Sequence, residues 1–225
     1  LGEAATFIQH EGSSIGPRQS EAHAHCFKIA DDGRFAFSAD LGMDRVMIYA
    51  LDAASGTLTP GEQAFARVAP GEGPRHFTIA PNNSQAYVIN EIGNTVTAFD
   101  YDAERGLLLE RDTITTIPEG YDGTTHTADL CLTPDGRFLY GSNRGHDSIA
   151  MYRVDGGSGG LTPIGIELCG EPSPQNLTMS ADGKLLFVAL STTGKILAYH
   201  IDQSTGALSM GSQTPVPQPM CSKLA

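Results

Sequence analysis

The sequence predicts an all-β fold, a β-propeller made of four-stranded antiparallel blades, with about four blades present. The first observation is internal repetition, because similar segments begin at residues 30, 80, 133 and 180, giving offsets of 50, 53 and 47 residues. The second is that each segment alternates short apolar runs with turn signals, as antiparallel strands do. The third is that no segment shows a sustained helical apolar period, which disfavours an α/β fold.

Each repeat contains the same elements in the same order. An apolar strand leads to an Asp-Gly or Asn-Asn turn, a second apolar strand follows, and a short polar loop leads to a third, alternating strand. A turn rich in Ser, Gly and Ala then enters a fourth strand through "SGTL", "RGLL", "GGLT" or "TGAL". Four antiparallel strands in about 50 residues are typical of a propeller blade. The central parts that align without gaps are "ADDGRFAFSADLGMDRVMIYALD" (30–52), "APNNSQAYVINEIGNTVTAFDYD" (80–102), "TPDGRFLYGSNRGHDSIAMYRVD" (133–155) and "SADGKLLFVALSTTGKILAYHID" (180–202).

Residues 1–225 are expected to form a single propeller segment. Residues 1–15 match the outer strand of a preceding blade, and such a start favours a longer propeller, or one completed by another chain, over a closed four-bladed ring. An incomplete ring would expose sheet faces that neighbouring blades normally cover, so self-association is expected. The predicted blade repeats lie near residues 23–65, 73–115, 126–168 and 173–213.

Composition limits the expected partners. The formal net charge is −12 and no Lys/Arg cluster is longer than a pair, which argues against nucleic acid and anionic membranes. No apolar run is long enough to cross a bilayer. The cysteines are widely scattered and form no CxxC motif, which favours free thiols in a reducing compartment and a cytoplasmic location. They are Cys26, Cys131, Cys169 and Cys221.

The phase of the repeats predicts a site at one mouth of the propeller channel. Positions equally far from the first hairpin turn lie at the same end of a blade, and residues 25 and 41 are each eight residues from Gly33. Translating them by the offsets gives one ring of His25, Arg75, Ala128 and Gln175, and another of Leu41, Glu91, Arg144 and Ser191. The four ionisable members should converge on one axis, as a small-molecule site requires. The alternative is a solvated polar rim in which Glu91 only pairs with the arginines.

Three stretches carry a resemblance to a known family. "GPRHFTIAPNNSQAYVINEIGNTVTAFDYD", "LCLTPDGRFLYGSNRGHDSIAMYRVD" and the upstream "EAHAH" resemble the lactonase family of seven-bladed β-propellers. This family includes propeller-type 6-phosphogluconolactonases and fungal carboxy-muconate lactonising enzymes, and the resemblance extends to about residue 210. It implies that the four blades belong to a seven-bladed ring and that the protein is an enzyme, a lactonase that hydrolyses a carboxylic ester.

The resemblance implies catalytic residues at the positions that repeat phase selects. The family's HxH motif corresponds to His25, or to His23 in an alternative alignment, and its other motifs correspond to Arg75, Glu91 and Arg144. The further candidates for substrate binding are His23, His76, Asn143 and Gln175. On an extended strand His76 should point away from Arg75, so packing or hydrogen bonding is its expected role. The fourth repeat departs from the family with "SPQNL" and "ALST", which makes that side of the site less polar.

The side chains suit the hydrolysis of a lactone. His25, with an ordinary pKa of about 6.5, can accept a proton from water, while Glu91 can orient that histidine or act as the base itself. Arg75 is expected to stabilise the oxyanion that forms at the ester carbonyl. Arg144 is expected to anchor a distal carboxylate or phosphate through paired hydrogen bonds.

No metal and no cofactor are expected. The imidazoles of His23, His25 and His126 could approach one another, because the first and third occupy equivalent repeat positions. However, the sequence contains no HExxH motif and no dense cluster of acidic residues and histidines at fixed spacing.

The leading hypothesis is hydrolysis of a small anionic sugar lactone. The resemblance points to 6-phosphogluconolactone, whose opening to 6-phosphogluconate belongs to the pentose phosphate pathway of carbohydrate metabolism. Two alternatives remain. The same arginines, histidine and glutamate could serve the cycloisomerisation of a carboxylated muconate, or the propeller could bind a partner protein or metabolite without catalysis.

Overall fold

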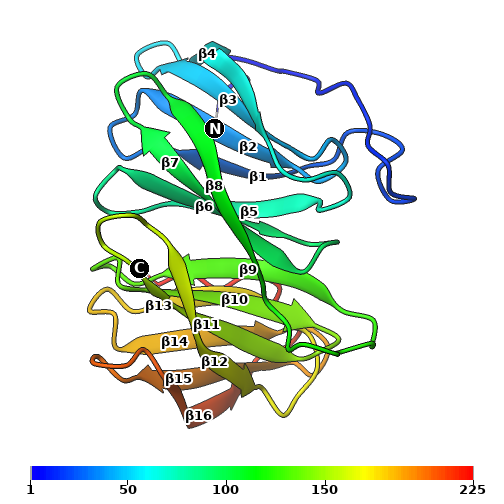
Figure 1. Cartoon of the computed structure of the whole chain (residues 1–225), viewed down its shortest axis with the longest axis vertical. Coiled ribbons are helices and arrows are strands. Elements are labelled where there is room, and N and C mark those ends of the chain that lie inside the picture. Colours follow the sequence, from blue (N-terminus) through cyan, green and yellow to red (C-terminus); the bar gives the residue numbers. More distant parts are fainter. Residues whose placement is uncertain (1, 225) are drawn as a thin grey trace.

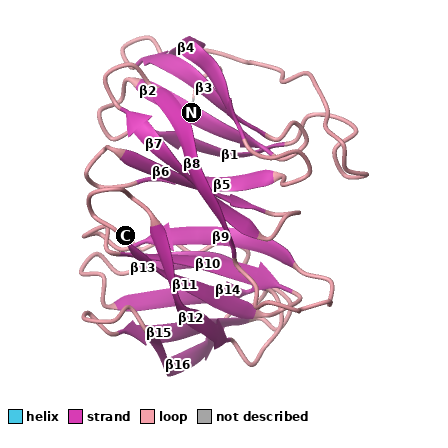
Figure 2. Cartoon of the chain, in the orientation of Figure 1, coloured by secondary structure: helices cyan, strands magenta, loops and turns pink. Residues whose placement is uncertain are grey.

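The computed structural model describes residues 2–224 and contains sixteen strands and no helix in that range. The strands form four separate four-stranded antiparallel sheets, which confirms the predicted all-β propeller with about four blades. In Figure 1 the blades follow one another from the blue and cyan N-terminal blade at the top to the orange and red C-terminal blade at the bottom. Figure 2 shows strands joined only by loops and turns. Residues 2–224 thus offer no helix long and apolar enough to cross a membrane.

The strand bounds follow the sequence repeats closely. The first blade comprises β1 (Ala24–Ile29), β2 (Phe35–Asp40), β3 (Arg45–Asp52) and β4 (Thr57–Arg67), and the second comprises β5 (Pro74–Ile79), β6 (Gln85–Asn90), β7 (Thr95–Asp102) and β8 (Leu107–Thr115). The third comprises β9 (His126–Leu132), β10 (Phe138–Arg144), β11 (Ser148–Val154) and β12 (Leu161–Leu168), and the fourth comprises β13 (Pro174–Met179), β14 (Leu185–Leu190), β15 (Lys195–Ile201) and β16 (Leu208–Pro215). The first strands of successive blades contact one another, so β1, β5, β9 and β13 line the inner side of the arc.

The hairpin between the first two strands of each blade uses residues that tolerate a positive φ. Gly33 has a φ of 70° and donates its N–H to the Ala30 carbonyl at 2.9 Å. In the second blade Asn83 takes the same place with a φ of 54° and donates to the Ala80 carbonyl at 2.9 Å. Glycine and asparagine are the residues that enter the left-handed region most readily, so both turn sequences close the same hairpin.

The recurring glycine before the fourth strand makes a contact between blades. Gly206 has a φ of 80°, and a Cβ at this position would lie 2.3 Å from the Phe138 ring of the preceding blade. The hydroxyl of Tyr140 donates to the Gly206 carbonyl at 2.9 Å. Gly106 packs in the same way against the Phe35 ring of the first blade. The Gly-x-Leu signal therefore marks close packing between neighbouring blades as well as a turn.

The apolar core lies between the blades. At the first junction the ring of Phe37 stacks on that of Phe77 with 4.9 Å between centroids, and the edge of Tyr101 completes the cluster. The other face of the first blade is less covered, since Phe27 and Ile29 on β1 are 53% and 45% exposed. The expected self-association stays a prediction.

Residues 2–23 precede the first blade and contain no strand. The Thr6 hydroxyl donates to the Gly56 carbonyl at 3.2 Å, and His10 Nδ1 lies 2.6 Å from Asp40 Oδ2, so the segment runs along the first blade. The outer strand that the sequence predicts within residues 1–15 stays a prediction, and residue 1 lies outside the described range.

Candidate active site

The first strand of each blade carries a β-bulge close to the end that faces the site. Each bulge leaves an extra residue without a partner on the second strand, and such insertions re-aim a side chain out of the regular alternation. In β1, β5 and β13 the extra residues are His25, Arg75 and Gln175, and in β9 residues 128 and 129 together oppose Ser142. The bulges thus fall on the ring of positions that repeat phase selects.

The second ring begins where the second strands end. Glu91 follows β6 directly, and Arg144 is the last residue of β10. Both rings contribute to a cavity of about 560 Å³, which brings together the four predicted catalytic side chains, His25, Arg75, Glu91 and Arg144. His23 and Leu41 also line this cavity, together with Pro17, Arg18 and Ser20 from the N-terminal segment.

Glu91 lies at the centre of a cluster of arginines. Arg75 Nε donates to Glu91 Oε2 at 2.8 Å, and Arg144 Nη2 lies 3.1 Å from the same oxygen. Arg18 Nη2 donates to the other oxygen, Oε1, at 2.7 Å. Burial alone would raise the pKa of Glu91, but the hydrogen bond from Arg18 and the charges of Arg144 and Arg75 outweigh it and lower the pKa. Glu91 is therefore an ionised partner of the arginines and poorly suited to act as the base itself.

The two predicted arginines, Arg75 and Arg144, differ in their exposure to solvent. Arg75 is only 4% exposed, and besides Glu91 it donates to the Ala128 carbonyl oxygen. Burial, with the charge of Arg144, lowers the pKa of Arg75. The Arg144 side chain is 24% exposed, donates to the Thr127 carbonyl at 2.8 Å and approaches Gln175 Oε1 at 3.5 Å. Arg75 is therefore a fixed cation in the wall, whereas Arg144 reaches further into the opening.

His25 is exposed but its ring sits among groups that disfavour a positive charge. Desolvation of the ring, followed by the charge of Arg75 and the neighbouring His76, lowers the pKa of His25 to about 4, although Glu91 acts in the opposite direction. The sequence alone suggested an ordinary value near 6.5. The imidazole is therefore neutral around pH 7, although the lowered pKa also makes it a weaker base than a free histidine.

His76 stands behind His25 and does not line the cavity. The two rings are 5.3 Å apart between centroids, and His76 Nδ1 lies 2.5 Å from Asp129 Oδ1. Asp129 itself is 5% exposed and accepts hydrogen bonds from the side chain of Asn176 at 2.7 Å and from the Leu177 N–H at 2.9 Å. A hydrogen-bonding role, as its strand position indicates, is what the geometry shows for His76.

Asn143 lies away from the cavity, in contrast to its expected contact with substrate. Its side chain is 0% exposed, and its amide donates to the Thr116 carbonyl at 2.9 Å and to the Ser148 hydroxyl at 3.1 Å. Its oxygen accepts a hydrogen bond from the Thr116 hydroxyl at 2.6 Å. With these donors and this acceptor engaged, Asn143 holds the loop before β9 against its blade and has no free group for a ligand.

The remaining candidates are His23, Gln175 and, for the metal alternative, His126. His23 lines the cavity and Gln175 contacts Arg144, whereas His126 lies outside the lining. Within residues 2–224 no group of three or more His, Cys, Asp or Glu side chains is arranged to hold a metal ion.

Arg18 is a cavity-lining residue that sequence reasoning missed. It lies before the first repeat, so it has no equivalent in the other blades and repeat phase cannot select it. Arg18 precedes Gln19, which is fully buried, but this burial is visible only in the folded chain. Asp129 was also missed, although it lies 53 residues after His76 and so occupies the equivalent position in the third blade.

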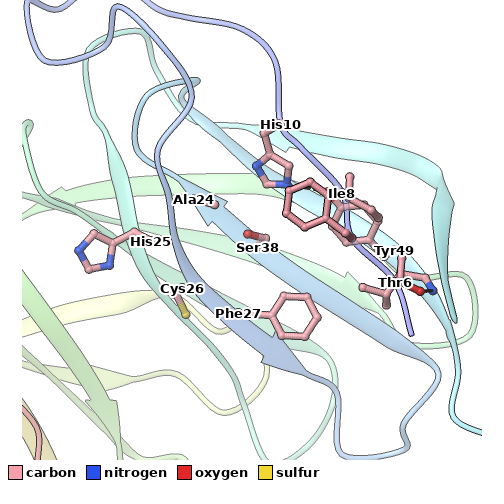
Figure 3. A pocket seen from close by; sticks show the side chains of 11 residues that line it. Thr6, Ile8, His10, Ala24, His25, Cys26, Phe27, Ser38 and Tyr49 are labelled. Carbon is pink, nitrogen blue, oxygen red and sulfur yellow. Dashed lines mark hydrogen bonds between the residues drawn. The ribbon is translucent and has the colours of Figure 1, made fainter. Parts of the chain in front are cut away.

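A second cavity of about 330 Å³ lies beside His25 on the first blade. Figure 3 shows His10 and Tyr49 near each other on one side of it, Phe27 and Cys26 from β1 below, and His25 turned away from this group. His10 Nε2 lies 2.7 Å from the Tyr49 hydroxyl while Nδ1 contacts Asp40, so this histidine is fully engaged in holding the N-terminal segment. The cluster therefore supports the position of the segment that carries Arg18.

Comparison with known proteins agrees with the propeller fold. A Bacillus subtilis protein named 6-phosphogluconolactonase is 32% identical over 216 residues, which cover 95% of this chain and 60% of the relative. Among solved structures, a Bacteroides fragilis protein superposes with a TM-score of 0.88 and 35% identity, over 96% of this chain and 62% of that chain. The periplasmic gluconolactonase of Pseudomonas aeruginosa superposes with a TM-score of 0.89 and 28% identity, over 96% of this chain and 60% of that chain.

The chain spans about 60% of the length of the curated relatives it matches. The family described as "Lactonase, 7-bladed beta-propeller" matches residues 1–224. This chain therefore belongs to the seven-bladed β-propeller lactonase family.

Proposed function

We propose that this chain provides the catalytic wall of an enzyme that hydrolyses a sugar lactone, with 6-phosphogluconolactone as substrate and 6-phosphogluconate as product. The observation that carries the proposal is that His25 lines the same cavity as a cluster of arginines fixed by Glu91. The name of the Bacillus subtilis relative supports the choice of substrate.

The charge of the cavity suits an anionic substrate. Its lining includes three arginines and one glutamate, which leaves an excess of two positive charges on a chain whose net charge is −12. A sugar phosphate carries a charge of about −1.5 to −2 near pH 7, as phosphate monoesters do. The cavity therefore concentrates the positive charge that the rest of the surface lacks.

The proposed reaction begins when neutral His25 takes a proton from a water molecule. The resulting hydroxide adds to the lactone carbonyl carbon, and the oxyanion that forms is stabilised by the positive charge of Arg75. The intermediate collapses by breaking the bond between the carbonyl carbon and the ring oxygen, and the leaving oxygen takes the proton back from His25. A pKa of about 4 makes protonated His25 a strong enough acid for this last step.

Glu91 and Arg144 complete the proposed site. Glu91 accepts hydrogen bonds from arginines on both of its oxygens and so fixes their positions before substrate arrives. Arg144, which is more exposed than Arg75, binds the anionic end of the substrate. His23 and Gln175 border this region, and a direct contact with substrate is proposed for both.

We also propose a cytoplasmic location. Cys26, Cys131, Cys169 and Cys221 are all free, which suits a reducing compartment.

The test is the hydrolysis of freshly generated 6-phosphogluconolactone by the intact protein that contains this chain, corrected for spontaneous ring opening. Arg75→Ala should lower kcat, because the oxyanion forms only along the reaction path, whereas Arg144→Ala should mainly raise KM. Arg111→Ala is the matched control, since Arg111 is exposed on β8 and pairs with Asp100 on the neighbouring strand. No rate above the spontaneous one would refute the lactonase assignment, and the reverse pattern of kinetic effects would exchange the two arginine roles.

A further inference from the structure

An arm formed by residues 14–20 holds one exposed cation over the cavity. The arm is anchored by Gln19, which is 0% exposed and donates through its amide to the Leu41 carbonyl at 2.8 Å and to Asp44 Oδ1 at 2.7 Å. Gln19 Oε1 accepts from the Gly16 N–H at 3.0 Å, and the Gln19 carbonyl accepts from the Ser14 N–H at 2.9 Å. These hydrogen bonds of the buried Gln19 fix the position of the backbone next to Arg18.

The anchor is itself tied to the junction of the first two blades. Asp44 accepts the Gly71 N–H on one oxygen and the Gly73 N–H on the other, both at 2.7 Å, in the loop that leads to β5. Because β5 carries Arg75, the arm and the cavity wall share one hydrogen-bonded support. Arg18 is therefore held in a defined place relative to Arg75.

The three arginines of the site form a gradient of exposure. Their side chains are 5% exposed for Arg75, 24% for Arg144 and 48% for Arg18. Arg75 and Arg144 approach one oxygen of Glu91, whereas Arg18 approaches the other. Arg18 is thus the cation nearest the open mouth, on the opposite side of the carboxylate from the two inner ones.

Most of the hydrogen-bonding capacity of Arg18 is unused within residues 2–224. Its guanidinium makes a single side-chain hydrogen bond there, from Nη2 to Glu91 Oε1. A guanidinium has five N–H donors, and two neighbouring ones match the oxygens of a phosphate or carboxylate. Arg18 can therefore bind an anion at the mouth while it keeps its bond to Glu91.

We infer that Arg18 is the specificity-determining residue of the site and selects lactones that carry a phosphate on the end remote from the reacting carbonyl. This inference rests on the proposed lactonase function and deepens it. The carbonyl end lies by His25 and Arg75 in the wall, and the phosphate lies at the mouth between Arg144 and Arg18. A lactone without the phosphate loses the contacts that Arg18 makes.

The inference is tested with two substrates that differ only in the phosphate group. Values of kcat/KM are measured for 6-phosphogluconolactone and for unphosphorylated glucono-δ-lactone, with the intact protein, Arg18→Gln, Arg18→Lys and the control Arg111→Gln. In Arg18→Gln the ratio of the phosphorylated to the unphosphorylated value should fall about 10- to 100-fold, mainly through KM for the phosphorylated substrate, as loss of a charge-assisted hydrogen bond predicts. Arg18→Lys should recover part of the ratio, since it keeps the charge without the paired donors.

The outcomes separate the inference from the proposed function. If the intact protein hydrolyses neither lactone, the proposed function fails. If it hydrolyses a lactone but the ratio in Arg18→Gln equals that of Arg111→Gln, the lactonase assignment stands and the selective role of Arg18 is refuted. An equal loss for both substrates would also overturn the inference, because it would show that Arg18 acts only by holding Glu91.

Discussion

Replacement of Asp129 by asparagine should lower the stability of the propeller more than any change of charge at the surface. Asp129 lies on β9 and receives four hydrogen bonds, two on each oxygen. Oδ1 is 2.5 Å from His76 Nδ1 and accepts the Leu130 N–H at 2.9 Å. Oδ2 accepts the Asn176 amide at 2.7 Å and the Leu177 N–H at 2.9 Å, so one carboxylate joins three successive blades.

The size of the effect follows from these contacts. An asparagine has one oxygen and one NH2 group, and the smaller loss arises when the NH2 faces His76 and Leu130. A neutral imidazole can accept from this NH2 at Nδ1, so only the hydrogen bond from the Leu130 N–H is lost. A hydrogen bond to a charged group contributes about 1.5–3 kcal/mol, which is the expected loss in the free energy of unfolding. For a domain of this size, 1 kcal/mol shifts Tm by about 2–4 °C, so the expected decrease in Tm is about 3–12 °C.

The assay is thermal unfolding followed by circular dichroism, at pH 7 and the same scan rate for each variant. Asp122→Asn is the matched control, because Asp122 is exposed in the loop before β9 and the same chemical change there removes no buried contact. A decrease in Tm below about 2 °C for Asp129→Asn, or one equal to that of the control, would refute the argument that Asp129 joins the blades.

Two further predictions concern the pH response and the packing between blades. Folding lowers the pKa of His25 from 6.5 to about 4, so between these pH values the unfolded chain binds more protons than the folded one. The contribution of His25 to the free energy of unfolding therefore decreases as the pH falls from 6.5 to about 4. In His25→Gln the free energy of unfolding, measured in urea, should depend less on pH in this window, and an unchanged dependence would contradict the shift. Gly206→Ala places a Cβ 2.3 Å from the Phe138 ring at a φ of 80°, so the free energy of unfolding measured in urea should fall by about 1–3 kcal/mol. Gly156→Ala is the control, because a Cβ there meets no atom within 4 Å and should have little effect. Equal effects of the two substitutions would refute the packing argument.

The sequence predicts the blades well because their signals are local. Turn residues such as Gly33 and Asn83 define where each hairpin closes, and the repeat offsets then place His25, Arg75, Glu91 and Arg144 in one cavity. These inferences need only strand alternation and the repeat length.

The sequence predicts the site less well where the surroundings of a side chain depend on neighbouring strands or on segments outside the repeat. Asn143 is a candidate for substrate binding by sequence, but the alternation of β10 turns it towards Thr116 and buries it. Arg18 comes from a segment without repeat equivalents, so only the folded chain shows that it meets Glu91. The low pKa of His25 also depends on groups from the second blade, Arg75 and His76.

The bulge near the start of each first strand makes the side chain at that position independent of the strand pairing in the blade. The residue in the bulge has no partner in the ladder, so its identity does not affect the pairing of the strands on either side. This explains how an imidazole, a guanidinium and a carboxamide can occupy the same place in blades whose backbones are alike. Each blade of the propeller can thus place a different functional side chain near the common axis without any change in the pairing of its strands.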